Sequence, residues 1–131
     1  EIHVKKFNCD DPVDRELLTD KSLTTLQQLV GKASFVFIDE GQFFDGIENF
    51  CKVLQKYGIN VTIAALNSTY ELKPWPRVSN LIAICSNIKK LNAICIKCGK
   101  KAPYSKRISN SIKLEDIGGQ DKYEAVCPEH F

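Results

Sequence analysis

The sequence predicts an α/β domain over residues 1–87, built on a parallel sheet with helices, and a small β subdomain over residues 88–131. Two short apolar runs, at 35–38 and 61–66, flank an amphipathic segment, which is the strand–helix–strand pattern of a parallel sheet. The second part consists of short β-prone runs separated by Cys, Gly, Pro and Lys, so the composition changes near its start. With 131 residues, of which 44% are apolar and 26% are charged, the chain can bury a hydrophobic core.

Hydrophobic spacing justifies each element in chain order. Leucines at near-helical spacing predict a helix within residues 14–29. The uninterrupted apolar run FVFI at 35–38 predicts a strand that is buried on both faces. Residues 46–57 place apolar side chains on one side of a helix, which Gly58 ends. The run VTIAAL at 61–66 predicts a second buried strand, followed by a loop rich in aromatic residues and proline.

The net charge of +2 conceals an asymmetry between the two parts of the chain. Residues 1–66 carry an excess of acidic groups, whereas residues 67–131 carry an excess of basic groups. The basic excess is concentrated in residues 89–107, a stretch that contains seven Lys and Arg residues and no acid. Such a stretch is either a solvated face of the subdomain or a surface that attracts substrate phosphates or nucleic acid. Charge alone does not distinguish these interpretations.

The ends of the chain and its hydropathy bear on its location. No apolar run approaches the ~18 residues that a membrane span requires, and no signal peptide opens the chain. We therefore expect a cytoplasmic protein without a membrane partner. The chain begins with Glu1 and contains no Met, so we expect it to be part of a longer polypeptide.

Two pairs of metal-ligating residues stand 28 residues apart, Cys95-x-x-Cys98 and Cys127-x-x-His130. The two-residue spacing lets both side chains of a tight turn reach one metal, and Gly99 suits such a turn. A redox-active C-x-x-C is the competing interpretation, but it would not need a second pair. We therefore predict that these four side chains hold a structural Zn²⁺, which stabilises a ribbon too small to fold alone.

Two carboxylates, Asp39 and Glu40, directly follow the first predicted sheet strand. Ligands of open α/β sheets bind beyond the carboxyl ends of the strands. An Asp after four apolar residues is the Walker B arrangement, in which the carboxylate holds Mg²⁺ directly or through water. Glu40 could accept a proton from an attacking hydroxyl or water. The alternative is an acidic turn in which Asp45 caps the next helix.

A Walker B carboxylate acts together with a P-loop, G-x-x-x-x-G-K-[ST], whose backbone N–H groups and Lys hold the phosphates. The Gly-Lys pairs of this chain, 31–32 and 99–100, are followed by Ala33 and Lys101, so neither is a P-loop. We therefore expect a P-loop upstream of Glu1 and a P-loop-type sheet that is incomplete at the N-terminus of this chain.

Several motifs resemble the type II thymidine kinases in order and spacing: DEGQFF at 39–44, AALNSTYELKPW at 64–75, the C-x-x-C pair, YSKR at 104–107, IGGQDKYEAVC at 117–127 and the closing C-x-x-H. The resemblance covers residues 33–131. It implies a P-loop α/β domain joined to a zinc ribbon, with a lasso loop that closes over the nucleoside. It also implies transfer of the γ-phosphoryl group of ATP to the 5′-hydroxyl of thymidine, with Mg²⁺ accompanying ATP, in a homotetramer.

The resemblance further implies roles for individual residues. Asp39 corresponds to the Mg²⁺-associated carboxylate and Glu40 to the general base, while the ATP phosphates approach the segment Asp39, Glu40, Gly41 and Gln42. The residues placed around the nucleoside are Phe43, Leu66, Tyr70, Trp75, Ser105, the lasso stretch Leu114, Glu115, Asp116, Ile117 and Gly118, and Tyr123. The zinc ligands correspond to Cys95, Cys98, Cys127 and His130. Asp116 is acidic where the family tends to be apolar, so we expect its side chain to point to solvent.

These observations predict a thymidine kinase polypeptide that binds thymidine and ATP and no nucleic acid, and we expect this partial chain to be inactive on its own. A non-catalytic zinc-ribbon protein that binds nucleic acid through residues 89–107 is the main alternative. It would leave the strand–helix–strand unit and the aromatic loop without a role. A different P-loop ATPase with an appended ribbon is a further alternative, which would hydrolyse ATP without a nucleoside.

Overall fold

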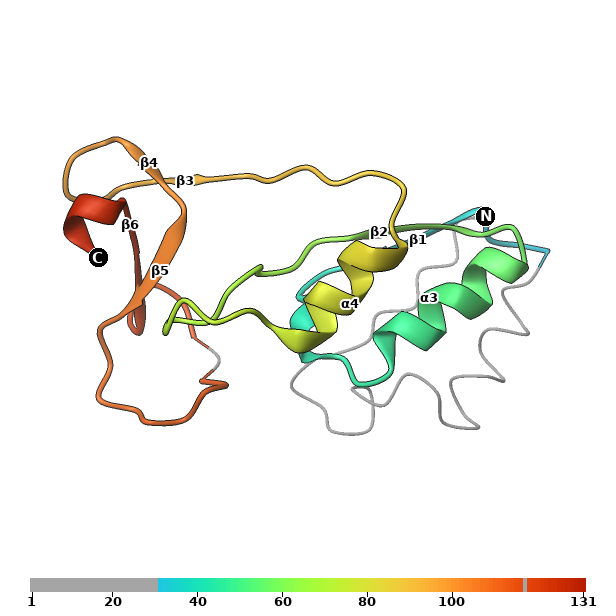
Figure 1. The fold of residues 1–131 in the computed structure, drawn as a ribbon, viewed down its shortest axis with the longest axis horizontal. Coiled ribbons are helices and arrows are strands. Elements are labelled where there is room, and N and C mark those ends of the chain that lie inside the picture. The colour runs from blue at the N-terminus through green and yellow to red at the C-terminus, as the bar shows by residue number, and fades with distance from the viewer. Residues whose placement is uncertain (1–30, 117) are drawn as a thin grey trace. The chain divides into compact units, whose positions relative to one another are not determined.

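The computed structural model describes residues 31–116 and 118–131 (Figure 1). The helix predicted within residues 14–29 therefore lies outside the described residues, as does Ile117. The described residues form two compact units: the first runs to Leu66 and resumes over Trp75–Cys85, and the second comprises Asn67–Pro74 and Ser86–Phe131. The folding domains expected at 1–87 and 88–131 stay a prediction, because compactness does not show which part folds alone.

The first unit contains the predicted strand–helix–strand pattern. Strands β1 (Phe35–Ile38) and β2 (Asn60–Ile63) pair in parallel, with Phe35 opposite Asn60 and Ile38 opposite Ile63. Helix α3 (Ile47–Lys56) connects them, as a parallel pair requires. The α/β fold class is thereby confirmed. A 3₁₀ turn, η1 (Gly41–Phe43), follows β1, and helix α4 (Pro76–Ile84) begins with a proline in its first turn.

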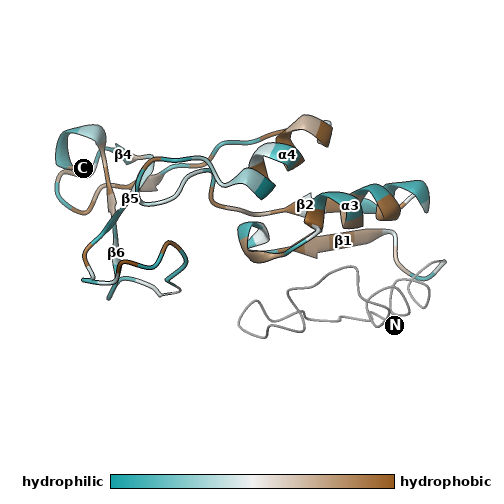
Figure 2. Cartoon of the chain, turned by 60° about the horizontal axis from the view of Figure 1, so that its bottom comes forward, coloured by the Kyte–Doolittle hydropathy of each residue, from teal (hydrophilic) through white to brown (hydrophobic). Residues whose placement is uncertain are grey.

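The core of the first unit lies between α3 and the sheet. Ile47, Phe50, Cys51 and Leu54 share one face of α3 at helical spacing, and all are buried. They pack with Phe44, Ile59 and Leu81, and with half-buried side chains of both strands. Figure 2 shows the apolar side of α3 facing the strands. The predicted amphipathic helix is therefore correct, although its bounds are shorter than expected.

The expectation that β1 is buried on both faces was wrong for the described sheet. Phe35 and Phe37 are 63% and 76% exposed, whereas Val36 and Ile38 are half-buried against the core. Successive side chains of a strand point to opposite faces. Among the described residues α3 and α4 pack against the face that carries Val36 and Ile38, so the pleat leaves the two phenylalanines on the other face.

The second unit is a small ribbon of antiparallel pairs. Strand β3 (Ala93–Ile94) pairs with β4 (Lys101–Ala102), and β5 (Tyr104–Arg107) pairs with β6 (Tyr123–Val126). A 3₁₀ turn, η2 (Pro128–His130), follows β6. Its buried core consists of Cys95, Ala102, Val126 and Cys127. The loop that joins β5 to β6, residues 108–122, is called the lasso below.

A membrane-spanning helix must be about 20 residues long and predominantly apolar. None of the helices within residues 31–116 and 118–131 meets both requirements.

Candidate functional sites

The four residues at metal-ligand spacing converge in the ribbon. The thiol sulfurs of Cys95, Cys98 and Cys127 and a ring nitrogen of His130 all lie within 4.8 Å of one another. The Cys98 and Cys127 Sγ atoms are 3.7 Å apart, and His130 Nδ1 lies 3.7 Å from Cys95 Sγ and 3.1 Å from Cys127 Sγ. Ligand atoms of one tetrahedral zinc are about 3.5–3.8 Å apart. This cluster could therefore hold Zn²⁺ after a small rotation of the imidazole.

Two tight turns place these ligands. In the first turn the Cys95 N–H donates to the Lys100 carbonyl at 2.8 Å, and the Gly99 N–H returns to the Cys95 carbonyl at 2.8 Å. Gly99 has φ +74°, a left-handed conformation that glycine adopts without steric cost. In the second turn the His130 N–H donates to the Cys127 carbonyl at 3.0 Å. The backbone thus presents each pair of side chains on one side of its turn.

The first turn also favours the thiolate form of Cys95. Burial raises the pKa of this thiol, but backbone hydrogen bonds from Cys127, Lys97 and Cys98 outweigh burial and lower the pKa to about 6. Because metals bind the thiolate rather than the thiol, the turn is suited to a metal ligand.

Four groups of the basic stretch are bound within the ribbon itself. Lys100 Nζ pairs with the Glu129 carboxylate at 2.9 Å, and Lys97 pairs with Glu124 at 3.3 Å. Lys106 Nζ donates to the backbone carbonyl of His130 at 3.4 Å, and Arg107 binds backbone carbonyls of the lasso. The basic stretch therefore serves in part to fasten the second zinc turn and the lasso. No sequence pattern predicts these pairings, because the partners lie more than 20 residues away or are backbone groups.

The predicted acidic site forms a tight turn after β1. The Asp39 carboxylate accepts the N–H of Glu40 at 2.9 Å, and the Gly41 N–H donates to the Ala64 carbonyl at 3.0 Å. Glu40 has φ 52°, in the left-handed region that side chains other than glycine rarely adopt. A Cβ on Gly41 would lie 2.6 Å from Ile63 Cγ2, so the close approach to β2 requires glycine.

A buried glutamine fixes the Glu40 side chain. The fully buried Gln42 donates from Nε2 to Glu40 Oε2 at 2.5 Å, and its Oε1 accepts the Leu66 N–H at 3.1 Å. Both ends of this amide are thus used within the first unit. The Gln42 carbonyl accepts a hydrogen bond from Arg77 Nη1 at 3.0 Å, and Arg77 Nη2 pairs with Asp45. The family resemblance associates Gln42 with the ATP phosphates, and no sequence pattern indicates this bridge.

The helix-capping alternative for Asp45 is not supported. The N-cap of α3 is Gly46, and no side chain caps this end of the helix. Asp45 instead pairs with Arg77 of α4. The acidic turn is therefore not explained by a capping role.

An aromatic cluster lies beside the acidic turn. Phe43 and Trp75 pack edge to face with ring centroids 5.8 Å apart, and Val78 completes the cluster. Trp75 is buried, and its Nε1 has no hydrogen-bond partner among the described residues. Leu66, at the end of the segment that binds Gln42, is 45% exposed. The first unit thus brings together Asp39, Glu40, Gly41, Gln42, Phe43, Leu66 and Trp75.

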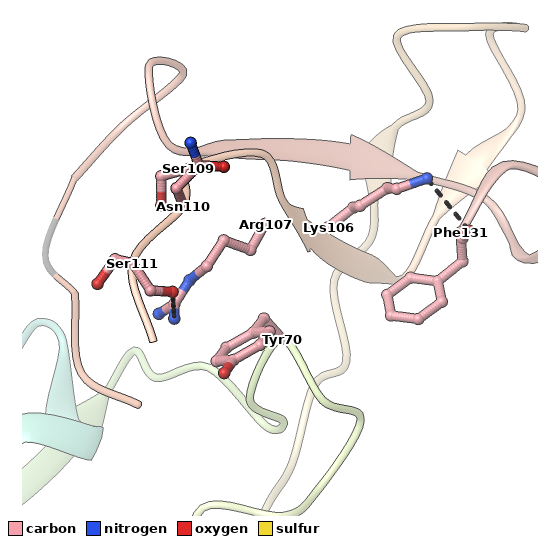
Figure 3. Close-up of a pocket in the computed structure, with 7 residues that line it drawn as sticks. All are labelled: Tyr70, Lys106, Arg107, Ser109, Asn110, Ser111 and Phe131. Carbon is pink, nitrogen blue, oxygen red and sulfur yellow. Dashed lines mark hydrogen bonds between the residues drawn. The ribbon is translucent and has the colours of Figure 1, made fainter. Parts of the chain in front are cut away.

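The remaining predicted nucleoside residues belong to the second unit. Tyr123 lies at the start of β6, and Ser105 on β5 is half-buried opposite Ala125. The Tyr70 ring lies under the Arg107 guanidinium, with 3.7 Å from the Arg107 Cζ atom to the ring centroid (Figure 3). Four of the lasso residues predicted to bind the nucleoside are described by the structure: Leu114, Glu115, Asp116 and Gly118. Ile117 lies outside the described residues.

Asp116 does not point to solvent, which corrects the expectation from the sequence. Its side chain is 14% exposed and accepts hydrogen bonds from Lys122 Nζ at 2.6 Å and from the Ser109 hydroxyl at 3.4 Å. The hydrogen bond from Lys122 lowers the pKa of the Asp116 carboxyl against the opposing effect of burial. A partner within the lasso thus explains why an acid is accommodated at this position.

The described residues form an α/β unit with an acidic turn after β1 and a Cys₃His ribbon. This combination is the one expected of a kinase that joins an α/β domain to a zinc ribbon. A model of the thymidine kinase family matches residues 10–131. The chain is therefore a member of the thymidine kinase family.

Relatives with the printed name thymidine kinase support this membership. The chain is 41% identical to that of rabbit fibroma virus (strain Kasza) over 106 residues, which is 81% of this chain and 60% of the relative. It is 45% identical to that of raccoon poxvirus over 94 residues, covering 72% and 53% of the two chains. For vaccinia virus (strain Western Reserve) the identity is 39% over 112 residues, covering 86% and 63%. The chain thus spans 53–63% of the length of these relatives.

Proposed function

We propose that this chain carries the catalytic base and the nucleoside-binding elements of an ATP-dependent thymidine kinase. The reaction transfers the γ-phosphoryl group of ATP to the 5′-hydroxyl of thymidine. Membership of the thymidine kinase family supports the proposal. The observation that carries it is the Glu40 carboxylate, which a buried glutamine orients at the carboxyl end of a parallel strand.

Glu40 is the proposed general base. Its Oε2 receives the hydrogen bond from Gln42, and its Oε1 receives none from the described residues. We therefore assign Oε1 to accept the proton of the thymidine 5′-hydroxyl. A carboxylate that is oriented before the substrate arrives loses little freedom in the transition state, which favours proton transfer. The left-handed backbone of Glu40 is consistent with a residue held for function rather than for stability.

Asp39 is the proposed ligand of the Mg²⁺ that accompanies ATP, because carboxylate oxygens are the ligands that Mg²⁺ prefers. Bound Mg²⁺ would neutralise phosphate charge during the transfer. Gly41 and Gln42 are the residues proposed to approach the phosphates. For Gln42 this approach would use the backbone, because its side-chain amide is bound to Glu40 and Leu66.

The residues that the family resemblance assigns to the nucleoside are proposed to bind it. These are Phe43, Leu66 and Trp75 in the first unit, and Tyr70, Ser105, the stretch 114–118 and Tyr123 in the second. Aromatic faces suit a flat pyrimidine, and backbone groups suit its hydrogen-bonding edge. Zinc at the Cys₃His cluster is proposed to be structural, since all four ligand positions of a tetrahedral ion are filled by protein. A homotetramer in the cytoplasm is proposed from the family resemblance alone.

Internal pairing in the ribbon weighs against the nucleic-acid alternative. Four of the seven basic groups in residues 89–107 bind partners within the second unit, namely Lys97, Lys100, Lys106 and Arg107. A phosphate-binding surface gains affinity from cations that displace counterions. Cations that already neutralise carboxylates or bind carbonyls contribute less to such a surface.

Fluorescence of Trp75 tests the proposal, because the chain contains one tryptophan. We expect thymidine to change the emission, since Trp75 packs against the proposed base-binding residue Phe43. A Phe43→Leu variant keeps apolar volume but loses the ring. It should therefore need about tenfold more thymidine for the same change in emission. No response to thymidine, together with a salt-sensitive response to an oligonucleotide, would contradict the kinase and support a nucleic-acid-binding ribbon.

A further inference from the structure

We propose that Arg107 is a positioning residue that shapes the lasso backbone, with Tyr70 as the platform that holds its guanidinium. The inference rests on the proposed function only in taking the lasso as a nucleoside-binding loop. In this proposal Arg107 and Tyr70 act through the lasso, and for Tyr70 this indirect role replaces the direct nucleoside contact that the family resemblance assigns to it. Arg107 is the last residue of the YSKR motif, and it is not among the residues to which the family resemblance assigns a role.

The guanidinium of Arg107 binds one side of the lasso at several points. Nη1 donates to the carbonyls of Ser111 at 3.0 Å and Lys113 at 2.5 Å. Nη2 donates to the carbonyl of Leu114 at 3.3 Å and to the Tyr123 hydroxyl at 2.7 Å. Backbone carbonyls normally need a partner when they leave water. One planar cation therefore serves a run of lasso residues that lies outside the strands.

The Tyr123 hydroxyl extends the same network. It accepts the hydrogen bond from Arg107 and donates to the Asp116 carbonyl at 2.7 Å. The carbonyls of Leu114 and Asp116 are thus both used inside the unit. If the backbone of Leu114, Glu115, Asp116 or Gly118 binds the pyrimidine, the groups available are those that this network leaves unbound. The network thereby selects which backbone groups can bind a base.

Tyr70 supports the guanidinium from the opposite side. The Arg107 Cζ atom lies 3.7 Å from the centroid of the Tyr70 ring, a close cation–π distance (Figure 3). Thr69 holds the loop that carries this ring: its hydroxyl accepts the N–H groups of Glu71 and Lys73, each at 3.3 Å. Arg107 Nε is buried without a hydrogen-bond partner among the described residues. The cation also lies 5.3 Å from the centroid of the Tyr123 ring and interacts electrostatically with the carboxylates of Asp116 and Glu71.

Lysine cannot reproduce this arrangement. The guanidinium is a rigid planar fork that can bind several carbonyls while one face lies on an aromatic ring, whereas an ammonium is a compact and strongly hydrated charge. Arg107→Lys therefore preserves charge but removes the geometry. Tyr70→Phe preserves the ring and removes the hydroxyl, and Tyr70→Ala removes both. These variants separate a positioning role from a general requirement for charge or polarity.

Hydrogen exchange of the lasso amides in the ligand-free 131-residue chain tests the proposal directly. We expect lasso amides to exchange about tenfold faster in Arg107→Lys and in Tyr70→Ala than in the unchanged chain. Both substitutions remove contacts that oppose local opening of the lasso. Tyr70→Phe should exchange like the unchanged chain. Lys113→Ala is the matched control, since it removes a lasso cation whose backbone carbonyl, and not its side chain, binds Arg107. Bound zinc, measured on each sample, shows that the ribbon remains folded.

Thymidine affinity of the same variants provides the second arm. Arg107→Lys and Tyr70→Ala should lose thymidine affinity to the degree that they lose protection of the lasso amides. Tyr70→Phe should keep both the affinity and the protection. Unchanged lasso exchange in Arg107→Lys would overturn the proposal. So would a Tyr70→Ala variant that loses thymidine affinity while its lasso stays protected, because Tyr70 would then contact the ligand itself. If Arg107→Lys loses its zinc, Tyr70→Ala decides the question. Failure of the unchanged chain to bind thymidine would contradict the proposed function without affecting the exchange result.

Discussion

The two units hold their proposed functional groups by different means. In the first unit Glu40 is fixed by a buried amide next to an apolar core of a helix and two strands. In the second unit the buried core contains four residues, two of which are proposed zinc ligands, and the lasso is held by polar side chains. A hydrophobic core tolerates the loss of a single contact, whereas a metal-centred ribbon depends on each ligand. The difference predicts that Glu40 and the lasso can be disturbed independently of each other.

The largest effect should come from the zinc ligands. Cys127→Ser should abolish metal binding and unfold the ribbon, because binding of a structural zinc contributes on the order of 10 kcal/mol to the folding of small ribbons. Helix α3 should persist, since its core is built from residues of the first unit. Metal analysis and residue-level hydrogen exchange measure both results. Full zinc occupancy in a folded Cys127→Ser protein would show that the site is not a four-ligand structural site.

The next effect concerns the proposed base. In a polypeptide that carries these residues behind a P-loop segment, Glu40→Gln should lower turnover by ~10²-fold or more while thymidine affinity stays close to normal. The amide keeps the size of the side chain but cannot take the proton. Steady-state kinetics and direct binding separate the two quantities. Equal losses of turnover and affinity would instead make Glu40 a binding or structural residue.

A smaller effect is expected from the glutamine that orients this base. Gln42→Ala leaves the Leu66 N–H and the Glu40 carboxylate without their partner, which should lower the free energy of unfolding by about 1–3 kcal/mol. Urea denaturation followed by Trp75 fluorescence measures this loss. The matched control is Gln55→Ala on the exposed side of α3, which should change stability by less than about 0.5 kcal/mol. Equal effects of both substitutions would remove the special role of Gln42.

Local patterns were sufficient to predict much of the molecule. Ile47, Phe50, Cys51 and Leu54 recur at helical spacing, so α3 could be predicted from the sequence. The zinc ligands could be predicted because their spacing within each pair is set by turn geometry. Helix α4 was not predicted, although Pro76 is a common first residue of a helix.

Long-range pairings between polar side chains could not be predicted. Gln42 binds Leu66, which lies 24 residues away, and Arg107 lies on the ring of Tyr70 from a distant loop. Nothing in hydrophobic periodicity specifies such partners. The solvent-facing expectation for Asp116 failed for the same reason, because a lysine six residues along the lasso neutralises it.

The smallest effect concerns this Asp116–Lys122 pair and its dependence on pH. The hydrogen bond from Lys122 lowers the pKa of Asp116 below its ordinary value of 3.8, and the reciprocal bond raises the pKa of Lys122 above 10.5. A carboxyl group with a lowered pKa stabilises the folded state at pH values above its ordinary pKa. A lysine with a raised pKa stabilises the folded state at pH values below its ordinary pKa. Both conditions hold between about pH 5.5 and 9, where the pair should therefore stabilise the lasso by a constant amount.

Asp116→Asn should accordingly increase lasso exchange by about two- to threefold, as expected for a partly exposed pair. The ratio to the unchanged chain should stay constant across this pH range, with exchange rates corrected for the intrinsic effect of pH. Replacing Lys122 with Gln in the Asp116→Asn background should add little, because the two substitutions remove the same pair. A ratio that falls towards one as the pH is lowered from 9 to 6 would mean that Asp116 takes up a proton in this range. The lasso would then be held by the carbonyl contacts of Arg107 alone at the lower pH, and the two anchors of the loop would separate into one that responds to pH and one that does not.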